Sequence, residues 1–195
     1  MNRKSRLMLL ATLVAAPLCQ AQALGIYSFM YFVGPKMSAG SSETESVDRV
    51  DRASFDRSSR FVISRFDRKM IGEFSRAWIR AGDGTAANES VVLILRMVGG
   101  GYSARSLGTT NQNRAFTFGW HPATVAVVHT HPNGSDPRPQ GEDIKVANKY
   151  GVPVFTITSR GMFVYDPSTR TTSMVKRNLD WLDSSNWTSE LARKQ

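Results

Sequence analysis

The spacing of apolar positions changes along the chain, and each spacing predicts a different element. Over residues 61–81 large apolar side chains recur at helical intervals, and Gly-Asp-Gly at 82–84 provides a stop, so we predict a helix there. Residues 90–98 are a β-rich run that closes on three glycines at 99–101. This pattern predicts a hairpin whose second strand covers residues 102–107.

Further apolar runs predict the rest of a sheet. Residues 124–128 are continuously apolar, as is typical of a buried central strand. From residue 172 onward the tail suits a terminal helix or an irregular cover. The other predicted elements are strands over residues 115–118, 152–158 and 162–165, the last two forming a hairpin, and a helix over 144–150. The sum is an α+β, α/β-like fold, with a mixed sheet flanked by helices.

The N-terminus has the plan of a secretory signal peptide. Three basic residues lie within the first six, an apolar stretch follows, and small residues precede a cleavage point after Ala23. We therefore predict a signal peptide over residues 1–23, followed by an apolar segment and a Ser/Asp/Arg-rich arm over residues 24–60. Export would place the rest of the chain in the periplasm or outside the cell.

An uncleaved membrane anchor is the alternative for this segment. No charged residue occurs between Arg6 and Lys36, and residues 7–33 are long enough to span a bilayer. The chain would then be anchored facing the periplasm. The single cysteine, Cys19, lies within the same segment, so the mature chain would contain no disulfide.

The charge balance bears on partners. The formal net charge is +9, which favours attraction to an anionic envelope surface. The basic residues are scattered and often stand beside acids, a pattern typical of a solvated surface, so we do not predict nucleic-acid binding. The pattern leaves the oligomeric state open.

The candidate chemistry lies at the end of the predicted central strand, which runs into His129-Thr130-His131-Pro132. Side chains at i and i+2 of a strand point to the same side, so both imidazoles can face one metal ion. A turn-rich loop follows and leads to Asp143 near the start of the next helix. Two imidazoles, one carboxylate and an open fourth position are typical of a catalytic zinc site. Asp136 and Glu142 are alternative third ligands.

The stretch HTHPNGSDPRPQGEDIKVA also resembles a family signature. It is similar to the metal-binding motif of the JAMM/MPN+ metalloproteases, H-x-H-P, a short loop and S-x-x-D, and is closest to the bacterial RadC-like form, with one extra loop residue. The resemblance covers roughly residues 65–167 and implies an MPN-type domain over 61–170 with cytidine-deaminase-like layering, followed by a C-terminal extension over 171–195. It implies Zn²⁺ as cofactor, His129, His131 and Asp143 as ligands, and a peptide or protein substrate.

The family also uses a glutamate at the start of an early strand as general base. Glu89 precedes the predicted strand at 90–98 and fits this role, whereas its rival Glu73 lies within a predicted helix. The serine of the family motif falls at Gln140, whose side-chain amide can donate a hydrogen bond to an oxyanion. Ser135, earlier in the loop, could substitute for it.

Together these features predict an exported zinc metallohydrolase that cleaves a peptide or isopeptide bond. A non-catalytic MPN-like binding module and a secreted effector or toxin domain of the same fold are the alternatives. We interpret His121 as a surface or supporting group, not a ligand. The four tryptophans are assigned to core or cover, namely Trp78, Trp120, Trp181 and Trp187.

Overall fold

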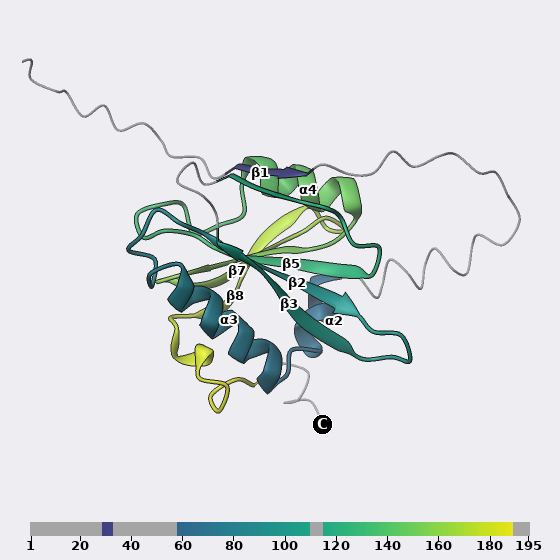
Figure 1. Ribbon diagram of the computed structural model, residues 1–195, viewed down its shortest axis with the longest axis horizontal. Helices are drawn as coiled ribbons and strands as arrows, with labels where there is room; N and C mark the ends of the chain where they lie inside the picture. Colours follow the sequence, from purple (N-terminus) through teal and green to yellow (C-terminus); the bar gives the residue numbers. More distant parts are fainter. Residues whose placement is uncertain (1–28, 33–57, 110–114, 189–195) are drawn as a thin grey trace, which may run out of the picture.

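A six-stranded mixed sheet lies at the centre of the fold (Figure 1). The structure, a computed structural model, describes residues 29–32, 58–109 and 115–188. The strand order is β3-β2-β5-β6-β7-β8, and every neighbouring pair is antiparallel except β5 and β6. The strands are β2 (Ser90–Arg96), β3 (Tyr102–Thr109), β5 (Thr124–Thr130), β6 (Val154–Thr158), β7 (Gly161–Asp166) and β8 (Thr171–Arg177).

Strand β5 is central, as its continuous apolar run predicts, and all seven of its residues are buried. It pairs in parallel with β6. A parallel pair needs a crossover connection, and helix α4 (Gly141–Tyr150) supplies it. The hairpins predicted around residues 99–101 and 159–161 are both present as β2–β3 and β6–β7. The mixed sheet flanked by helices confirms the α+β class.

The two faces of the sheet carry separate apolar cores. Along β2, Val92 and Ile94 pack on the side of helix α3 (Arg68–Arg80), while Val91 and Leu93 pack on the side of α4. This alternation is the period of two expected of a strand buried on both faces. Figure 1 shows α3 and α4 on opposite sides of the sheet.

The single helix predicted over residues 61–81 is instead two helices, α2 (Ser59–Ser64) and α3. Asp67 between them has extended backbone angles, and its side chain accepts a 2.8 Å hydrogen bond from the Met70 amide. Asp is among the preferred N-cap residues because it satisfies such an amide at a helix start. The apolar spacing continues across the break, which is why it did not reveal the new helix start.

The terminal helix predicted from residue 172 is wrong for its first part, which forms strand β8, and the only helical turn described beyond it is η1 (Asp180–Leu182). The alternative of an irregular cover holds for the following residues. Trp181 is buried in the core on the α3 side, and Trp187 packs against that core.

A second, two-stranded parallel sheet joins β1 (Phe29–Phe32) to the predicted strand β4 (Ala115–Phe118). Strand β1 contacts α4, and we did not expect a strand at residues 29–32. The signal peptide, its cleavage point, Cys19, most of the arm and the last seven residues lie outside the described residues. Within the described ranges, no helix has the length and apolar character needed to cross a membrane.

Candidate metal centre

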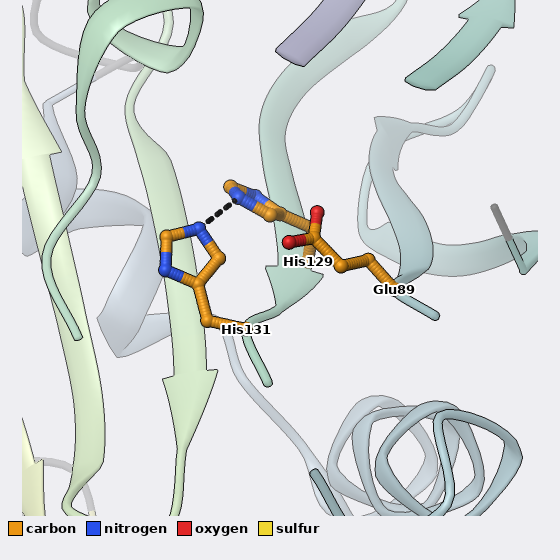
Figure 2. Close-up of side chains that lie close together, drawn as sticks. All are labelled: Glu89, His129 and His131. Atoms are coloured by element: carbon orange, nitrogen blue, oxygen red, sulfur yellow. Dashed lines mark hydrogen bonds between the residues drawn. The ribbon is translucent and has the colours of Figure 1, made fainter. Parts of the chain in front are cut away.

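The end of β5 places two imidazoles side by side. His129 lies on the α4 face of the strand, and His131 follows directly after the strand ends. Both are buried, with 1% and 4% of their surface exposed. Their Nε2 atoms are 2.9 Å apart (Figure 2). The HxH spacing therefore brings both rings to one point, as expected from the sequence.

Glu89 reaches the same point from the neighbouring strand. It directly precedes β2, which runs antiparallel to β5 with Val91 opposite His129. The start of β2 therefore lies beside the end of β5. Glu89 is 1% exposed, and ligand atoms of Glu89, His129 and His131 all lie within 4.8 Å of one another. Figure 2 shows its carboxylate converging on the two imidazoles.

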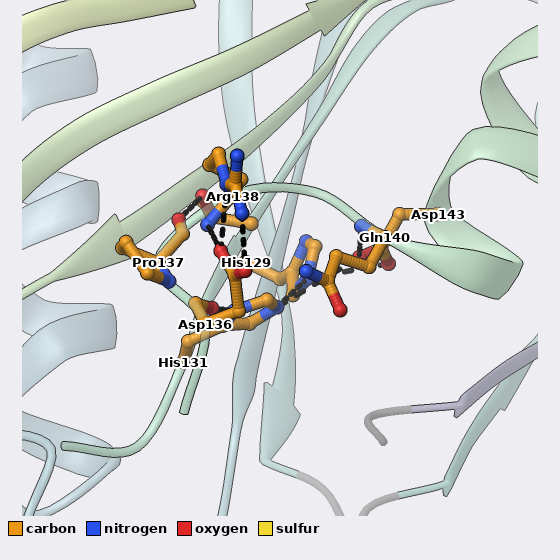
Figure 3. A network of polar contacts seen from close by, with 8 residues as sticks. His129, His131, Asp136, Pro137, Arg138, Gln140 and Asp143 are labelled. Atoms are coloured by element: carbon orange, nitrogen blue, oxygen red, sulfur yellow. Dashed lines mark hydrogen bonds and ion pairs between the residues drawn. The ribbon is translucent and has the colours of Figure 1, made fainter. Parts of the chain in front are cut away.

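Asp143 adds a second carboxylate from the first turn of α4. Its Oδ1 is 3.3 Å from His129 Nε2, and its Oδ2 is 3.7 Å from His131 Nε2. The backbone amide of Gln140, the N-cap residue of α4, donates a 3.0 Å hydrogen bond to Asp143 Oδ2 (Figure 3). The helix start thus fixes the aspartate, and the helix N-terminus favours its negative charge.

Burial and charge pairing have opposite effects on the pKa values of Asp143 and His131. Burial pushes the pKa of Asp143 upward, but His129 and His131 beside it hold that pKa well below its usual range. Burial likewise lowers the pKa of His131, and the adjacent carboxylates of Asp143 and Glu89 outweigh this effect and raise it. Without a metal, the site therefore favours an ionised carboxylate next to a protonated imidazole.

The two alternative third ligands are engaged elsewhere. The Asp136 carboxylate forms a two-pronged ion pair with Arg138, at 3.0 and 2.7 Å, and this pairing lowers the pKa of Asp136 to about 2. Glu142 pairs with Lys145 at 2.5 Å. Of the three acids weighed at the sequence level, Asp143 is the one that lies against both histidines.

The other sequence-level candidates fall at different places. Glu73 pairs with Arg76 on α3, across the sheet from the histidines. His121 is exposed, and its Nδ1 accepts a hydrogen bond from the Ala123 amide. The half-buried Gln140 side chain points toward the histidines in Figure 3. Ser135 lies in the loop after His131, half-buried.

Two buried threonines support the site and were missed from the sequence. Thr130 Oγ1 accepts a 2.9 Å hydrogen bond from the Ser90 amide and so joins the two strand ends that carry Glu89 and His129. The Thr156 hydroxyl donates a 2.5 Å hydrogen bond to the Pro137 carbonyl. A threonine within the apolar run of β6 was the available signal, because a buried hydroxyl requires a partner.

The residues present fit a metal ion. Imidazole and carboxylate groups are zinc ligands, and two nitrogens bound tetrahedrally to zinc lie about 3.4 Å apart, near the 2.9 Å between His129 and His131. Buried Asp143 Oδ1 makes no hydrogen bond to any described residue, although it faces His129. A cation would satisfy this oxygen and both ring nitrogens at once.

No protein-family model matches the chain, and no curated protein is significantly similar to it.

Proposed function

We propose that the chain is a zinc-dependent hydrolase that cleaves a peptide or isopeptide bond. One observation carries the proposal: Glu89, His129 and His131 converge within 4.8 Å in a buried site, and Asp143 lies against both histidines. Burying ionisable groups together costs desolvation free energy. A fold that nevertheless contains such a cluster is typical of a functional site.

We assign the metal to His129, His131 and Asp143. Asp143 faces both Nε2 atoms and is held by the α4 start, which suits a ligand of fixed position. Zinc bound there would supply Lewis acidity, lowering the pKa of a water ligand and polarising the carbonyl of the bond to be cleaved. Three protein ligands leave the remaining position for water and substrate.

Glu89 then acts as general base. Its carboxylate lies near the ligand atoms of the two histidines, within reach of a water molecule shared with them. It would accept a proton from the attacking water at a carboxylate oxygen and pass it to the leaving nitrogen. Such a positioned proton-transfer group contributes about 10² to 10⁴-fold in rate.

Gln140 is proposed to stabilise the developing negative charge. Its side chain points toward the histidines from the α4 start, and an amide N–H is a suitable donor to an oxyanion. The α4 N-terminus behind it adds a favourable dipole.

The motif, the placing of the site residues and the N-terminal sequence also support a family relationship and an exported location for the chain. The H-x-H-P motif, the placing of Asp143 at a helix start and the placing of Glu89 at a strand start support a JAMM/MPN+ relationship with its characteristic layering. The basic start and the apolar stretch that follows support export to the periplasm or beyond, with a membrane anchor as the alternative. The substrate would then be an envelope or secreted protein or a wall peptide.

The test is a cleavage assay on a panel of peptide and isopeptide substrates, with Glu89→Gln against wild type. We expect the variant to retain zinc and to lose about 10² to 10⁴-fold in activity. Glu73→Gln is the matched control, because Glu73 lies across the sheet on α3, and it should keep full activity. Full activity in Glu89→Gln would refute its role. A wild type that binds zinc but cleaves nothing would instead favour the non-catalytic binding module.

A further inference from the structure

We propose that Thr156 is a positioning residue that orients His131 toward the metal by anchoring the loop after it. This inference rests on the proposed metal centre and deepens it. Three contacts connect the His131 ring to Thr156: one from His131 to the loop, one within the loop, and one from the loop to the sheet.

The first contact sets which nitrogen of His131 carries the proton. Its Nδ1 lies 2.7 Å from the Asp136 carbonyl oxygen. A carbonyl oxygen only accepts hydrogen bonds, so Nδ1 must be the donor. In the neutral ring this leaves the lone pair on Nε2, the atom that faces His129 and Asp143. The Asp136 carbonyl thus selects the tautomer and the ring orientation that a metal requires.

The second contact holds the peptide that carries this carbonyl. Arg138 donates to the Asp136 carboxylate from its backbone amide at 2.9 Å and from its guanidinium at 3.0 and 2.7 Å. These bonds close a small ring over residues 136–138. Most of the Arg138 side chain is exposed, so the pair shapes the loop without filling the core.

The third contact fixes the loop to the sheet. Pro137 has no amide proton, so its carbonyl is the polar backbone group by which it can be held. The Thr156 hydroxyl donates to that carbonyl. Thr156 is fully buried on β6 and stands opposite His129 in the β5–β6 register. The Asp136 carbonyl that orients His131 is therefore held, through the next residue Pro137, against the strand beside the one that carries His129.

The experiment compares Thr156→Val, which removes the hydroxyl at similar volume, with Thr158→Val. Thr158 is a matched control: it is buried two residues further along β6, and its hydroxyl bonds the Gly161 carbonyl away from the loop. Zinc affinity is measured by competition with a chelator, alongside unfolding of the metal-free proteins. We expect Thr156→Val to bind zinc about 10- to 100-fold more weakly, the usual effect of losing a group that supports a ligand. Thr158→Val should bind as wild type does, and Thr156→Ser should restore affinity.

Nitrogen NMR of the His131 ring in metal-free protein gives a readout independent of zinc. We expect the Nδ1-protonated form for neutral His131 in wild type and a mixed population in Thr156→Val. Unchanged affinity and an unchanged ring in Thr156→Val would overturn the inference. Wild type that binds no zinc would refute the proposed function, while the NMR comparison would still decide the role of Thr156.

If Thr156→Val does not fold, Arg138→Ala replaces it, with Lys145→Ala as its control. Both side chains are mostly exposed and each forms one ion pair near the site, but only Arg138 holds the loop beneath His131. Weaker zinc binding in Arg138→Ala alone supports the inference, and equal binding in both variants overturns it.

Discussion

At the scale of single residues, the site is a buried group of opposing charges. Glu89, His129, His131 and Asp143 are each almost fully buried. Carboxylates in such a place need a cation, and in the absence of metal the imidazoles are the cations at hand. Protons and the proposed zinc ion would therefore compete for the same nitrogens, and this competition would have a measurable pH dependence.

The first prediction concerns that dependence. The pKa of His131 is raised above its usual value, so the metal-free fold takes up protons relative to the unfolded chain. The stabilisation from His131 is thus fully present below about pH 6.5 and is lost as pH rises through the folded pKa. Zinc needs the deprotonated ring, so its stabilisation should increase over the same range. Thermal unfolding should be measured between about pH 6 and about pH 8. The stability of the protein with chelator should fall as pH rises, and the added stability from zinc should increase. Changes in the same direction would contradict the pairing of His131 with the buried carboxylates.

The second prediction concerns Gly84, in the loop between α3 and Glu89. Its φ is +73°, and a Cβ there would lie 2.5 Å from Trp78 and 2.8 Å from Asn133. Its carbonyl also accepts the Asn133 amide, which joins this loop to the loop after His131. Gly84→Ala should lower the free energy of unfolding by about 1–3 kcal/mol through overpacking, in addition to the effect of backbone strain.

Gly100→Ala is the control for Gly84→Ala in urea unfolding. Gly100 also has a positive φ, at +96°, but a Cβ there would meet nothing within 4 Å. The difference between the two variants isolates the cost of the close contact. Equal losses of unfolding free energy would show that the contact with Trp78 and Asn133 does not matter.

Much of the site could be predicted because its spacing is local. The i, i+2 rule places His129 and His131 on one side, and a helix start is recognisable near Asp143. Glu89 needed the further inference that its strand pairs with the histidine strand. A threonine within an apolar run signals a buried hydroxyl at Thr156, but no local pattern identifies its partner, because Pro137 lies 19 residues away.

At the scale of elements, one aspartate fastens α2 to the end of β7. Asp166 Oδ2 accepts the Ser59 amide at 2.8 Å, and Oδ1 accepts the Ser168 amide and hydroxyl. Burial raises the pKa of Asp166, but these donors outweigh it and hold the pKa below its usual value. The carboxylate therefore stabilises the fold in its ionised form.

The third prediction follows. Asp166→Asn should lower the free energy of unfolding by about 1.5–3 kcal/mol at neutral pH, the usual contribution of a hydrogen bond to a charged group. Because the folded pKa is depressed, this stabilisation is present above about pH 4 and is lost as pH falls through the folded value. Asp183→Asn is the control, since the Asp183 carboxylate accepts the amide and hydroxyl of nearby Ser185, the same local contact that Asp166 Oδ1 makes with Ser168. Denaturant unfolding at neutral and acidic pH tests this prediction. If Asp166→Asn lowers the free energy of unfolding equally at both pH values, the charge of Asp166 has no role.

The apolar pattern of the sequence predicted some elements and missed others. The strands with continuous apolar runs were predicted because burial on both faces leaves a plain signal. The break at Asp67 was not, because the apolar stripe continues across α2 and α3 and only the cap marks the boundary. Strand β8 is largely exposed, so it has almost no apolar pattern to reveal it.

At the scale of the whole molecule, the sheet assembles the site from distant parts of the chain. Glu89 lies just before β2, His129 lies in β5 and His131 just after it, and Asp143 lies in α4, which packs on the face opposite α3. A metal held by these parts would join two strands and the crossover helix. Zinc should therefore stabilise the whole domain, by about 2.7 kcal/mol when free zinc is 100 times the dissociation constant.

The most direct test of the account is the zinc content of the purified protein, with titration of the metal-free form. We predict about one zinc per chain, as for a site with three protein ligands. His129→Ala and Asp143→Ala should lose it, Glu89→Gln should keep it, and His121→Ala should also keep it because His121 is the exposed histidine. Wild-type protein that carries no zinc and takes none up would contradict the central claim.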